Sequence, residues 1–374
     1  MYVTRFSANS ETGCRMKRVV VIAEDYDRTL VLLKELDKLG VQTVLWNVTT
    51  GSLLPCVPPE DAVYFCRQSP SSGTRGHQSS IPYVRNVLWW LKLHKVTVIN
   101  GLGAFEMEMS KSSQMALLHA RGVNTPHTRL VVGSRQLWVE LNAAAAYPPI
   151  PVIIKPDTGG SGVDIKAYPN ASQAAMHIWQ EAMYNTPAAQ GSMWIIQEHV
   201  NQYTEDETRM RSILRFEIVD GKVLYIVQIR APATDFKLCP CDPKMESMMS
   251  KIEFRIILDP YSIPCFRDHP DTYTSFVGKI EGVWRELDSS VGSVEAFMPV
   301  EHADDYTSRA YSDESTKVAH EPVVFEMNFN SNYNQKAEDL AGVNGAVQVA
   351  KMLERAAKAT PMTTTTPPPE IIDL

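Results

Sequence analysis

The densest set of chemically useful residues follows the apolar run at 152–154. That run ends at Lys155, and the loop after it contains Gly159, Gly160, Ser161 and Gly162. Glycines let a backbone approach an anion closely, a serine hydroxyl adds a donor, and a lysine supplies a positive point charge. These residues suit a phosphate site, although a hairpin tip with an incidental lysine explains them equally well. A P-loop is excluded, because Gly162 precedes a valine instead of the Lys-Ser/Thr pair that would open a helix.

A second polar group lies on a predicted strand that begins at residue 323. Glu326 and Asn328 are two residues apart, so their side chains share one face of that strand. Glu295 lies upstream, in a β-like segment that could pair with it. Carboxylate and amide oxygens are hard ligands that suit Mg²⁺, the ion used in phosphoryl transfer. An edge strand with a solvated acid is the alternative that these three residues leave open.

Two further patterns are weak. Asn100-Gly-Leu-Gly103 follows a strand but lacks the third glycine of a dinucleotide fingerprint, so a plain turn is favoured. A zinc site could be assembled from Cys239, Cys241, Cys265 and His269. The Cys-x-Cys spacing is not that of a recognised zinc knuckle, however, and a single histidine follows. We therefore interpret these cysteines as buried or surface thiols.

Strands and helices alternate over the first hundred residues, which is typical of parallel βαβ units. Apolar runs predict strands at 18–23, 41–46, 62–66 and 96–99. Leucines at helical spacing predict a helix that Gly40 ends, and a second helix is expected over 83–94. The serine- and glycine-rich stretch 69–80 is predicted to be a mobile loop.

The remaining chain predicts a second mixed region. The expected elements are a helix at 111–121, strands at 152–155, 194–197, 213–219 and 223–229, and a helix at 336–359. Asp220-Gly221, between two of those strands, is a dipeptide typical of hairpin turns. The Thr- and Pro-rich residues 360–374 are expected to form a disordered tail.

The composition is that of an ordinary globular protein, with 44% hydrophobic and 21% charged residues. A net charge of −7 argues against a nucleic-acid partner held by bulk phosphate neutralisation. Six cysteines in 374 residues suit reduced thiols, and no apolar run reaches the roughly 18 residues that cross a bilayer. Residues 1–17 lack the apolar centre of a secretory signal. We therefore expect a cytoplasmic protein with no membrane partner and no nucleic-acid partner.

In the order and spacing of these motifs, residues 1–357 resemble the ATP-grasp superfamily, in its glutathione-synthetase-like branch. The most specific motifs are the Lys-Pro-x-x-Gly-Gly-Ser-Gly loop at 155–162 and the Glu-x-Asn pair at 326–328. The helix from Lys111, the hinge strand 195–200 and the arginine-containing hairpin agree more loosely. The resemblance implies an α/β (α+β) fold, with an N-terminal Rossmann-like pre-ATP-grasp domain and a nucleotide bound between two α+β subdomains.

The resemblance also divides the chain into domains. The implied parts are a flexible N-terminus at 1–17, the pre-ATP-grasp domain at 18–103, a central lid subdomain at 104–200, a C-terminal subdomain at 201–359 with an insert at about 231–290, and the tail at 360–374.

Roles in nucleotide binding are implied for the residues that match the family motifs. Lys111 and Lys155 would hold the α- and β-phosphates of ATP, under a lid formed by the glycine loop 159–162. The adenine would lie along Gln197, Glu198, His199 and Val200. The ribose would contact a carboxylate after this hinge, for which Glu205 is the first choice and Glu207 nearly its equal.

Roles in the chemical step are implied in the same way. Arg215 and Arg230 would face the transferred phosphate and the substrate carboxylate, because a planar guanidinium suits both anions. Surface arginines on a sheet are the alternative. Glu295, Glu326 and Asn328 match the family's ligands for Mg²⁺, expected as two ions that Mn²⁺ can replace. The residues implied to orient the acyl substrate are Asn330 and Asn332.

The implied function is that of an ATP- and Mg²⁺-dependent carboxylate–amine ligase. Such an enzyme joins a small carboxylic acid to an amino acid or amine through an acyl phosphate, and releases ADP and phosphate. A thiol or hydroxyl acceptor, or a nucleotide-binding protein without catalysis, remains an alternative. A homodimer is a further expectation, because dimers are common among members of the superfamily.

Overall fold

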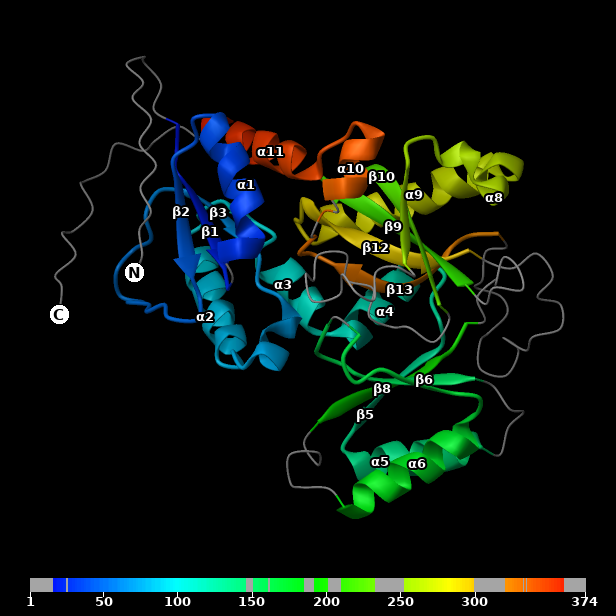
Figure 1. Cartoon of the computed structure of the whole chain (residues 1–374). Helices are drawn as coiled ribbons and strands as arrows, with labels where there is room; N and C mark the ends of the chain where they lie inside the picture. Colours follow the sequence, from blue (N-terminus) through cyan, green and yellow to red (C-terminus); the bar gives the residue numbers. More distant parts are fainter. Residues whose placement is uncertain are drawn as a thin grey trace.

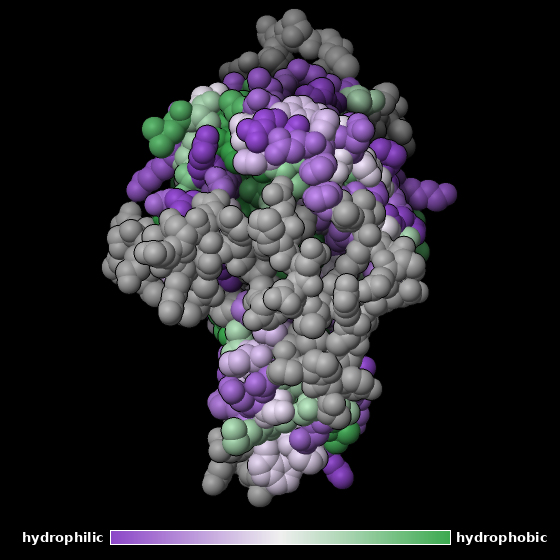
Figure 2. Space-filling view, turned by 90° about the vertical axis from the view of Figure 1, so that its right-hand side faces the viewer, coloured by the Kyte–Doolittle hydropathy of each residue, from purple (hydrophilic) through white to green (hydrophobic). Residues whose placement is uncertain are grey.

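The computed structural model describes residues 16–24, 26–145, 151–160, 162–184, 192–200, 210–232, 252–298, 320–331, 333 and 335–359. These residues form three sheets with helices packed on them (Figure 1). The sheets define an N-terminal unit, a smaller middle unit over residues 128–198 that we call the lid, and a C-terminal unit. The lid is a narrower lobe that projects from the rest of the molecule (Figures 1 and 2). No helix within these residues combines the length and apolarity needed to span a bilayer.

The N-terminal sheet is parallel, in the order β2-β1-β3-β4. Its strands are β1 (Val19–Ala23), β2 (Thr43–Asn47), β3 (Val63–Cys66) and β4 (Val98–Ile99). All five residues of β1 are buried, as an unbroken β-branched run predicts for a strand covered on both faces. Helices α1 (Tyr26–Lys38) and α2 (Ser80–Leu93) belong to this unit, and Gly40 follows α1 with φ +70°. The predicted βαβ alternation is confirmed.

The stretch after β3, where the sequence predicted a mobile loop, contains a short helix and long-range contacts. Residues Pro70–Arg75 form a 3₁₀ helix, η1, and the Ser69 side chain accepts a hydrogen bond from the Ser71 amide at its start. The buried Glu24 carboxylate, just after β1, accepts hydrogen bonds from Ser72 and from Arg75. The serine and glycine content of this stretch could not indicate its contacts with Glu24, because that residue is distant in the sequence.

The C-terminal helical region consists of two helices, although the sequence predicted one. Helix α10 (Gln335–Ala341) ends before Gly342, which has φ +70°. Helix α11 (Gly345–Ala359) begins after Asn344, whose side chain accepts a hydrogen bond from the Val347 amide. Helix α11 packs against α1 and the N-terminal sheet, and also against the Val219 end of β9 in the C-terminal sheet (Figure 1).

The lid contains an antiparallel sheet in the order β5-β8-β6-β7. Its strands are β5 (Thr128–Val132), β6 (Val152–Pro156), β7 (Lys166–Tyr168) and β8 (Met193–Glu198). Helices α5 (Ser134–Ala144) and α6 (Ala171–Tyr184) cover one face, where Leu137 and Leu141 are buried against Ala174 (Figure 1). The opposite face carries Ile153, Lys155 and Gln197, and it is turned toward the C-terminal unit.

The C-terminal sheet is antiparallel, in the order β11-β10-β9-β12-β13. Its strands are β9 (Met210–Val219), β10 (Lys222–Pro232), β11 (Glu253–Ile257), β12 (Val291–Phe297) and β13 (Val323–Asn328). The predicted hairpin is confirmed, with positive φ at both Asp220 and Gly221. Helices α3 (Leu102–Met109) and α4 (Lys111–Ala120) lie along the β13 side of the sheet (Figure 1).

Part of the predicted insert at 231–290 belongs to the core of this unit. Helices α8 (Pro264–Asp268) and α9 (Pro270–Glu286) follow a short 3₁₀ helix, η4 (Pro260–Ser262). Phe276 and Trp284 of α9 are fully buried against the face of β9 that carries Phe216. Residues 233–251 lie outside the described part of the chain.

Candidate active site

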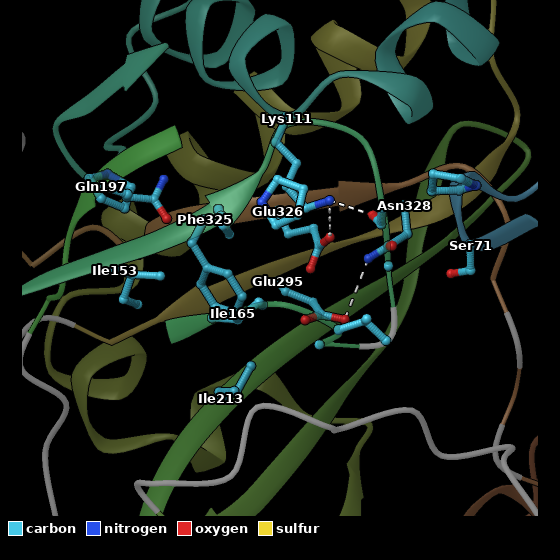
Figure 3. A pocket seen from close by; sticks show the side chains of 18 of the residues that line it. Ser71, Lys111, Ile153, Ile165, Gln197, Ile213, Glu295, Phe325, Glu326 and Asn328 are labelled. Atoms are coloured by element: carbon cyan, nitrogen blue, oxygen red, sulfur yellow. Dashed lines mark hydrogen bonds and ion pairs between the residues drawn. The ribbon is translucent and has the colours of Figure 1, made fainter. Parts of the chain in front are cut away.

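A deep pocket lies between the lid sheet and the C-terminal sheet, with its third wall formed by η1 (Figure 3). The predicted site residues that line it are Lys111, Lys155, Gly159, Gly160, Gly162, Gln197, Glu198, Val200, Arg215, Glu295, Glu326, Asn328 and Asn330. His199 and Arg230 are not among the lining residues. Ser161, Glu205 and Asn332 lie outside the described residues.

Two buried lysines meet at the centre of the pocket. Lys155 projects from β6, and burial is the main reason that its pKa is lowered to about 8. Lys111 is the first residue of α4, and its ammonium lies 3.7 Å from the Glu326 carboxylate. Asp157 joins the two segments, because its carbonyl accepts from the Lys111 amide (3.2 Å) and its carboxylate from the Ser112 amide (2.8 Å). The two positive charges therefore face the same space from fixed backbones.

The glycine loop after Lys155 folds over this space and touches η1. Gly159 and Gly162 have φ of +149° and +68°. A side chain at Gly160 would overlap the Ser71 hydroxyl unless that hydroxyl moved, so glycine permits the close approach seen here. The carbonyl of Gly159 accepts a hydrogen bond from the Lys111 ammonium at 2.5 Å. The loop therefore forms a flap between the lysines and the N-terminal unit.

Charged side chains form a row across three adjacent strands. Arg215 of β9 is opposite Glu295 of β12, which is opposite Glu326 of β13. The Arg215 guanidinium binds Glu295 at 2.8 Å and Glu217 at 2.6 Å. Burial raises the pKa of Glu295 to about 7, and the nearby Glu326 adds to this rise while Arg215 opposes it.

Glu295, Glu326 and Asn328 have the chemistry of a magnesium site. They lie on one face of paired strands, and Figure 3 shows all three side chains pointing into the pocket. The Asn328 amide is 3.4 Å from the Glu295 carboxylate. Within the described residues, no group of three or more His, Cys, Asp or Glu side chains could hold an ion. Two carboxylates with an amide oxygen nevertheless form the hard donor set that Mg²⁺ prefers.

The other end of the pocket is largely apolar. Ile153, Phe325 and Gln197 lie together there, and Ser71 lies at the far side (Figure 3). The buried Gln197 amide donates to the Thr128 hydroxyl at 2.9 Å, so this side chain has a structural partner. His199 follows at the end of β8 and donates its amide proton to the Pro151 carbonyl.

Arg230 lies on the opposite face of the C-terminal sheet from Arg215. A β-bulge at Leu224 shifts the register of β10, so Arg230 pairs with Ser212 of β9. Without the bulge, Arg230 would have been opposite Arg211 and on the pocket face. In the structure Arg230 binds Glu253 at 3.0 Å instead.

Arg211 and Glu108 line the pocket but were not predicted from the sequence. Arg211 is 3% exposed and lies four residues before Arg215, on the same face of β9. The period-two spacing of the two arginines could have indicated it. Glu108 of α3 is buried, which raises its pKa to about 7, and its carboxylate accepts from the Phe329 amide at 2.5 Å. No strand or helix was predicted around Glu108, so no sequence pattern pointed to it.

Asn330 lines the pocket, but both ends of its amide are engaged. Its Nδ2 donates to the Arg67 carbonyl at 2.9 Å, and its Oδ1 accepts from the Arg67 guanidinium at 3.1 Å. The same guanidinium also donates to the Ser331 carbonyl. Asn330 therefore joins the end of β3 to the segment that follows β13.

Residues of the two weak sequence patterns that the structure describes take part in structural contacts. Asn100 has φ +53° and forms the turn before α3, and its side chain binds the carbonyls of Val291 and Phe329. Cys265 donates its thiol to the His320 carbonyl at 3.4 Å, and His269 stacks on His320 with ring centroids 4.0 Å apart. Cys239 and Cys241 lie outside the described residues.

Comparison with solved structures identifies the fold. The RimK domain ATP-grasp protein from Sphaerobacter thermophilus superposes with a TM-score of 0.55 at 14% identity, over 89% of this chain and 98% of that chain. D-alanine–D-alanine ligase from Bacillus anthracis, complexed with ATP, gives 0.54 at 16% identity, over 92% and 97%. The ATP-grasp ligase PsnB, complexed with minimal precursor, Mg and ADP, gives 0.54 at 12% identity, over 94% and 100%.

No protein-family model and no curated protein matches the sequence. The structural similarity extends over nearly the whole of each matched chain, so it covers the N-terminal unit as well as the lid and the C-terminal sheet. The chain therefore has the ATP-grasp fold, and the fold class predicted from the sequence is confirmed.

Proposed function

We propose that this protein is an ATP- and Mg²⁺-dependent carboxylate–amine ligase that forms an amide bond through an acyl phosphate. The observation that carries the proposal is the convergence of Lys111 and Lys155 with Glu295, Glu326 and Asn328 in one pocket of an ATP-grasp fold. Two buried cations and a hard-oxygen donor set are what a triphosphate and its metal ion require.

In the proposed complex, the adenine occupies the apolar end of the pocket, between Ile153 and Phe325. The hinge residues Gln197, Glu198 and Val200 lie along its edge, and His199 contributes through its position in the backbone. The phosphates extend toward Lys111 and Lys155, beneath the flap. For the carboxylate that contacts the ribose, Glu205 remains the first choice and Glu207 nearly its equal, as the resemblance implies.

Glu295, Glu326 and Asn328 would hold the magnesium, with two ions expected. When bound there, the metal would neutralise charge on the phosphate oxygens and orient the terminal phosphate. Arg215 is held between Glu217 and Glu295, so its guanidinium is oriented before any substrate arrives. We assign it to the developing charge on the transferred phosphoryl group. We assign the substrate carboxylate to Arg211, on the same face, which replaces Arg230 as the second arginine of the site.

The proposed reaction has two steps. A carboxylate oxygen of the acid attacks the γ-phosphorus, the bond to ADP breaks, and an acyl phosphate forms. The nitrogen of an amine then attacks the acyl carbon, its proton is lost, and phosphate leaves with the electrons of the carbon–oxygen bond. The chain contributes position and fixed positive charge to both steps. Asn330 and Asn332 would lie beside the acyl group.

The acceptor is assigned to the amine class because one similar structure is a D-alanine–D-alanine ligase and another is the ATP-grasp ligase PsnB, complexed with minimal precursor, Mg and ADP. The second candidate is an acyl-phosphate ligase with a thiol or hydroxyl acceptor, since the pocket residues account for activation of the acid and not for the acceptor. A nucleotide-binding protein without catalysis is less well supported, because both lysines, Arg215 and the Glu-x-Asn pair are all present in the pocket.

ADP release with pooled carboxylic acids and amino acids tests the proposal, with mass spectrometry to find a condensation product that forms only with ATP. We expect Glu326→Ala to abolish turnover and leave the circular dichroism spectrum unchanged. Wild-type activity in that variant would contradict the metal assignment. If Mg²⁺ with ATP does not raise the melting temperature of the wild-type protein, nucleotide binding itself is wrong.

A further inference from the structure

The strand that carries Glu326 and Asn328 lies at the edge of its sheet. In the order β11-β10-β9-β12-β13, the described residues provide no strand beyond β13. Met327 and Phe329 are 1% and 3% exposed, so water does not reach the backbone groups that point outward there. Buried backbone groups without partners are costly, and this edge therefore needs other hydrogen-bonding groups.

Side chains of α3, α4 and the turn before α3 supply those groups. Gln114 makes a two-point contact with Met327: its Nε2 donates to the Met327 carbonyl and its Oε1 accepts from the Met327 amide, both at 2.9 Å. Its second N–H donates to the Met107 carbonyl at 2.8 Å. At Phe329, Glu108 binds the amide and Asn100 binds the carbonyl. The Gln114 amide thus takes the place of a neighbouring strand.

The position of this contact relates it to the metal ligands. Met327 stands between Glu326 and Asn328, and side chains alternate along a strand, so fixing the Met327 backbone fixes the direction of both neighbours. Gln114 also follows Lys111 by three residues, which places both on one side of α4. One helical turn therefore sets the position of Lys111 and of the strand whose Glu326 lies 3.7 Å from it (Figure 3).

We infer that Gln114 is a positioning residue that holds Glu326 and Asn328 in the arrangement that binds Mg²⁺ beside Lys111. The inference rests on the proposed function, because it concerns the metal ion of the proposed reaction. Gln114 is 2% exposed and does not line the pocket, so it acts through the strand and not on the nucleotide. Groups that orient metal ligands typically change metal affinity by about 10- to 100-fold when they are removed.

Two substitutions test Gln114 directly. Gln114→Met keeps the length of the side chain but leaves both Met327 backbone groups unpaired. Gln114→Glu keeps the shape and the acceptor oxygen but removes the two N–H donors. Met115→Leu is the matched control, because Met115 is buried on the same helix and packs in the apolar core. Thermal unfolding identifies which variants are folded, and Gln114→Glu serves if Gln114→Met is not.

The first measurement is the Mg²⁺ dependence of ADP binding by calorimetry, together with the Mg²⁺ concentration that gives half-maximal ATP turnover. For the Gln114 variants we expect the required Mg²⁺ concentration to rise about tenfold or more. ADP affinity without Mg²⁺ should stay within about threefold of the wild-type value, because Lys111 and Lys155 are unchanged. Excess Mg²⁺ should recover most of the turnover rate.

The second measurement needs neither metal nor turnover. Amide hydrogen exchange across residues 323–329 of the ligand-free protein should be faster in the Gln114 variants than in the wild type or in Met115→Leu. A folded Gln114 variant with wild-type Mg²⁺ dependence would overturn the inference, as would an equal loss of ADP affinity with and without Mg²⁺. Failure of the proposed function gives a different result, in which wild-type protein does not bind Mg²⁺ and ADP together.

Discussion

At the scale of single residues, the fold strongly changes the acidity of Lys155. Its ammonium is buried, which lowers its pKa to about 8, and the nearby Lys111 adds to this effect while Glu326 opposes it. A bound phosphate favours the protonated form of such a lysine, so phosphate binding and the protonation of Lys155 should be coupled near pH 8. The sequence could indicate that a lysine precedes a glycine loop, but not that this lysine would be enclosed.

The lowered pKa of Lys155 predicts how nucleotide affinity depends on pH. The charged form binds phosphate and is lost in the free protein as pH rises through about 8, so ADP affinity without Mg²⁺ should fall between pH 7 and pH 9.5. The limit is about tenfold per pH unit above the pKa. Calorimetry across this range measures the slope. Lys155→Met should bind weakly with a flatter profile, whereas the exposed Lys34→Met should keep the wild-type slope. An unchanged slope in Lys155→Met would show that titration of this lysine does not cause the pH dependence of ADP affinity.

Arg211 and Arg230 lie on opposite faces of the C-terminal sheet, so substituting each of them tests which face binds the substrate. Arg211→Met should lower turnover by about 100-fold or more, because Arg211 is buried at the pocket wall. Arg230→Met should stay within about threefold, because Arg230 binds Glu253 on the other face. Steady-state kinetics with a saturating acid substrate measure both. The reverse ranking would mean that Arg230 reaches the substrate after all.

At the scale of elements, the sequence predicted what depends on local pattern. Buried strands such as β1, the Asp220-Gly221 turn and the glycine end of α1 follow from residue type and spacing, and the structure confirms them. The sequence could not predict on which face of the sheet Arg230 lies. The bulge at Leu224 moves every later side chain of β10 to the face opposite the one that regular pairing would give. The Glu24 contacts that order η1 likewise join residues about 50 positions apart, which no local pattern reveals.

The flap and η1 predict a coupling between two elements that are distant in sequence. A methyl group at Gly160 would overlap the Ser71 hydroxyl, although it would lie 3.7 Å from the Ser71 Cβ. Gly160→Ala should therefore weaken nucleotide binding by about tenfold, and adding Ser71→Ala should restore most of it. A double-mutant cycle on ADP affinity measures the coupling, expected at about 1 kcal/mol. Additive effects of the two substitutions would show that the flap does not close against η1.

At the scale of the whole molecule, the site depends on three units that are built from distant parts of the chain. Asn100 and Arg67, which both follow strands of the N-terminal sheet, bind the segment after β13 through Phe329, Asn330 and Ser331. Helix α11 returns the end of the described chain to the N-terminal sheet, where the Ala357 carbonyl accepts from the Lys17 amide. The N-terminal unit is therefore fixed to the C-terminal sheet by polar contacts beside the proposed metal ligands, and it packs against a helix from the other end of the described chain.

This arrangement predicts that a core substitution in α11 destabilises a sheet more than 300 residues earlier in the sequence. Leu353 is fully buried in an apolar cluster that contains Leu36 and Val19 and that Val219, at the end of β9, also joins. Leu353→Ala should lower the free energy of unfolding by about 2–5 kcal/mol, because it leaves a cavity in that cluster. Urea unfolding measures the loss, and hydrogen exchange should increase more in Val19–Ala23 than in residues 210–216, because only the Val219 end of β9 joins the cluster. Lys351→Ala, at an exposed position of the same helix, is the control and should change neither quantity. If Leu353→Ala instead increased exchange in Met210–Val219 alone, α11 would belong energetically to the C-terminal sheet, as the sequence-based domain boundary proposed.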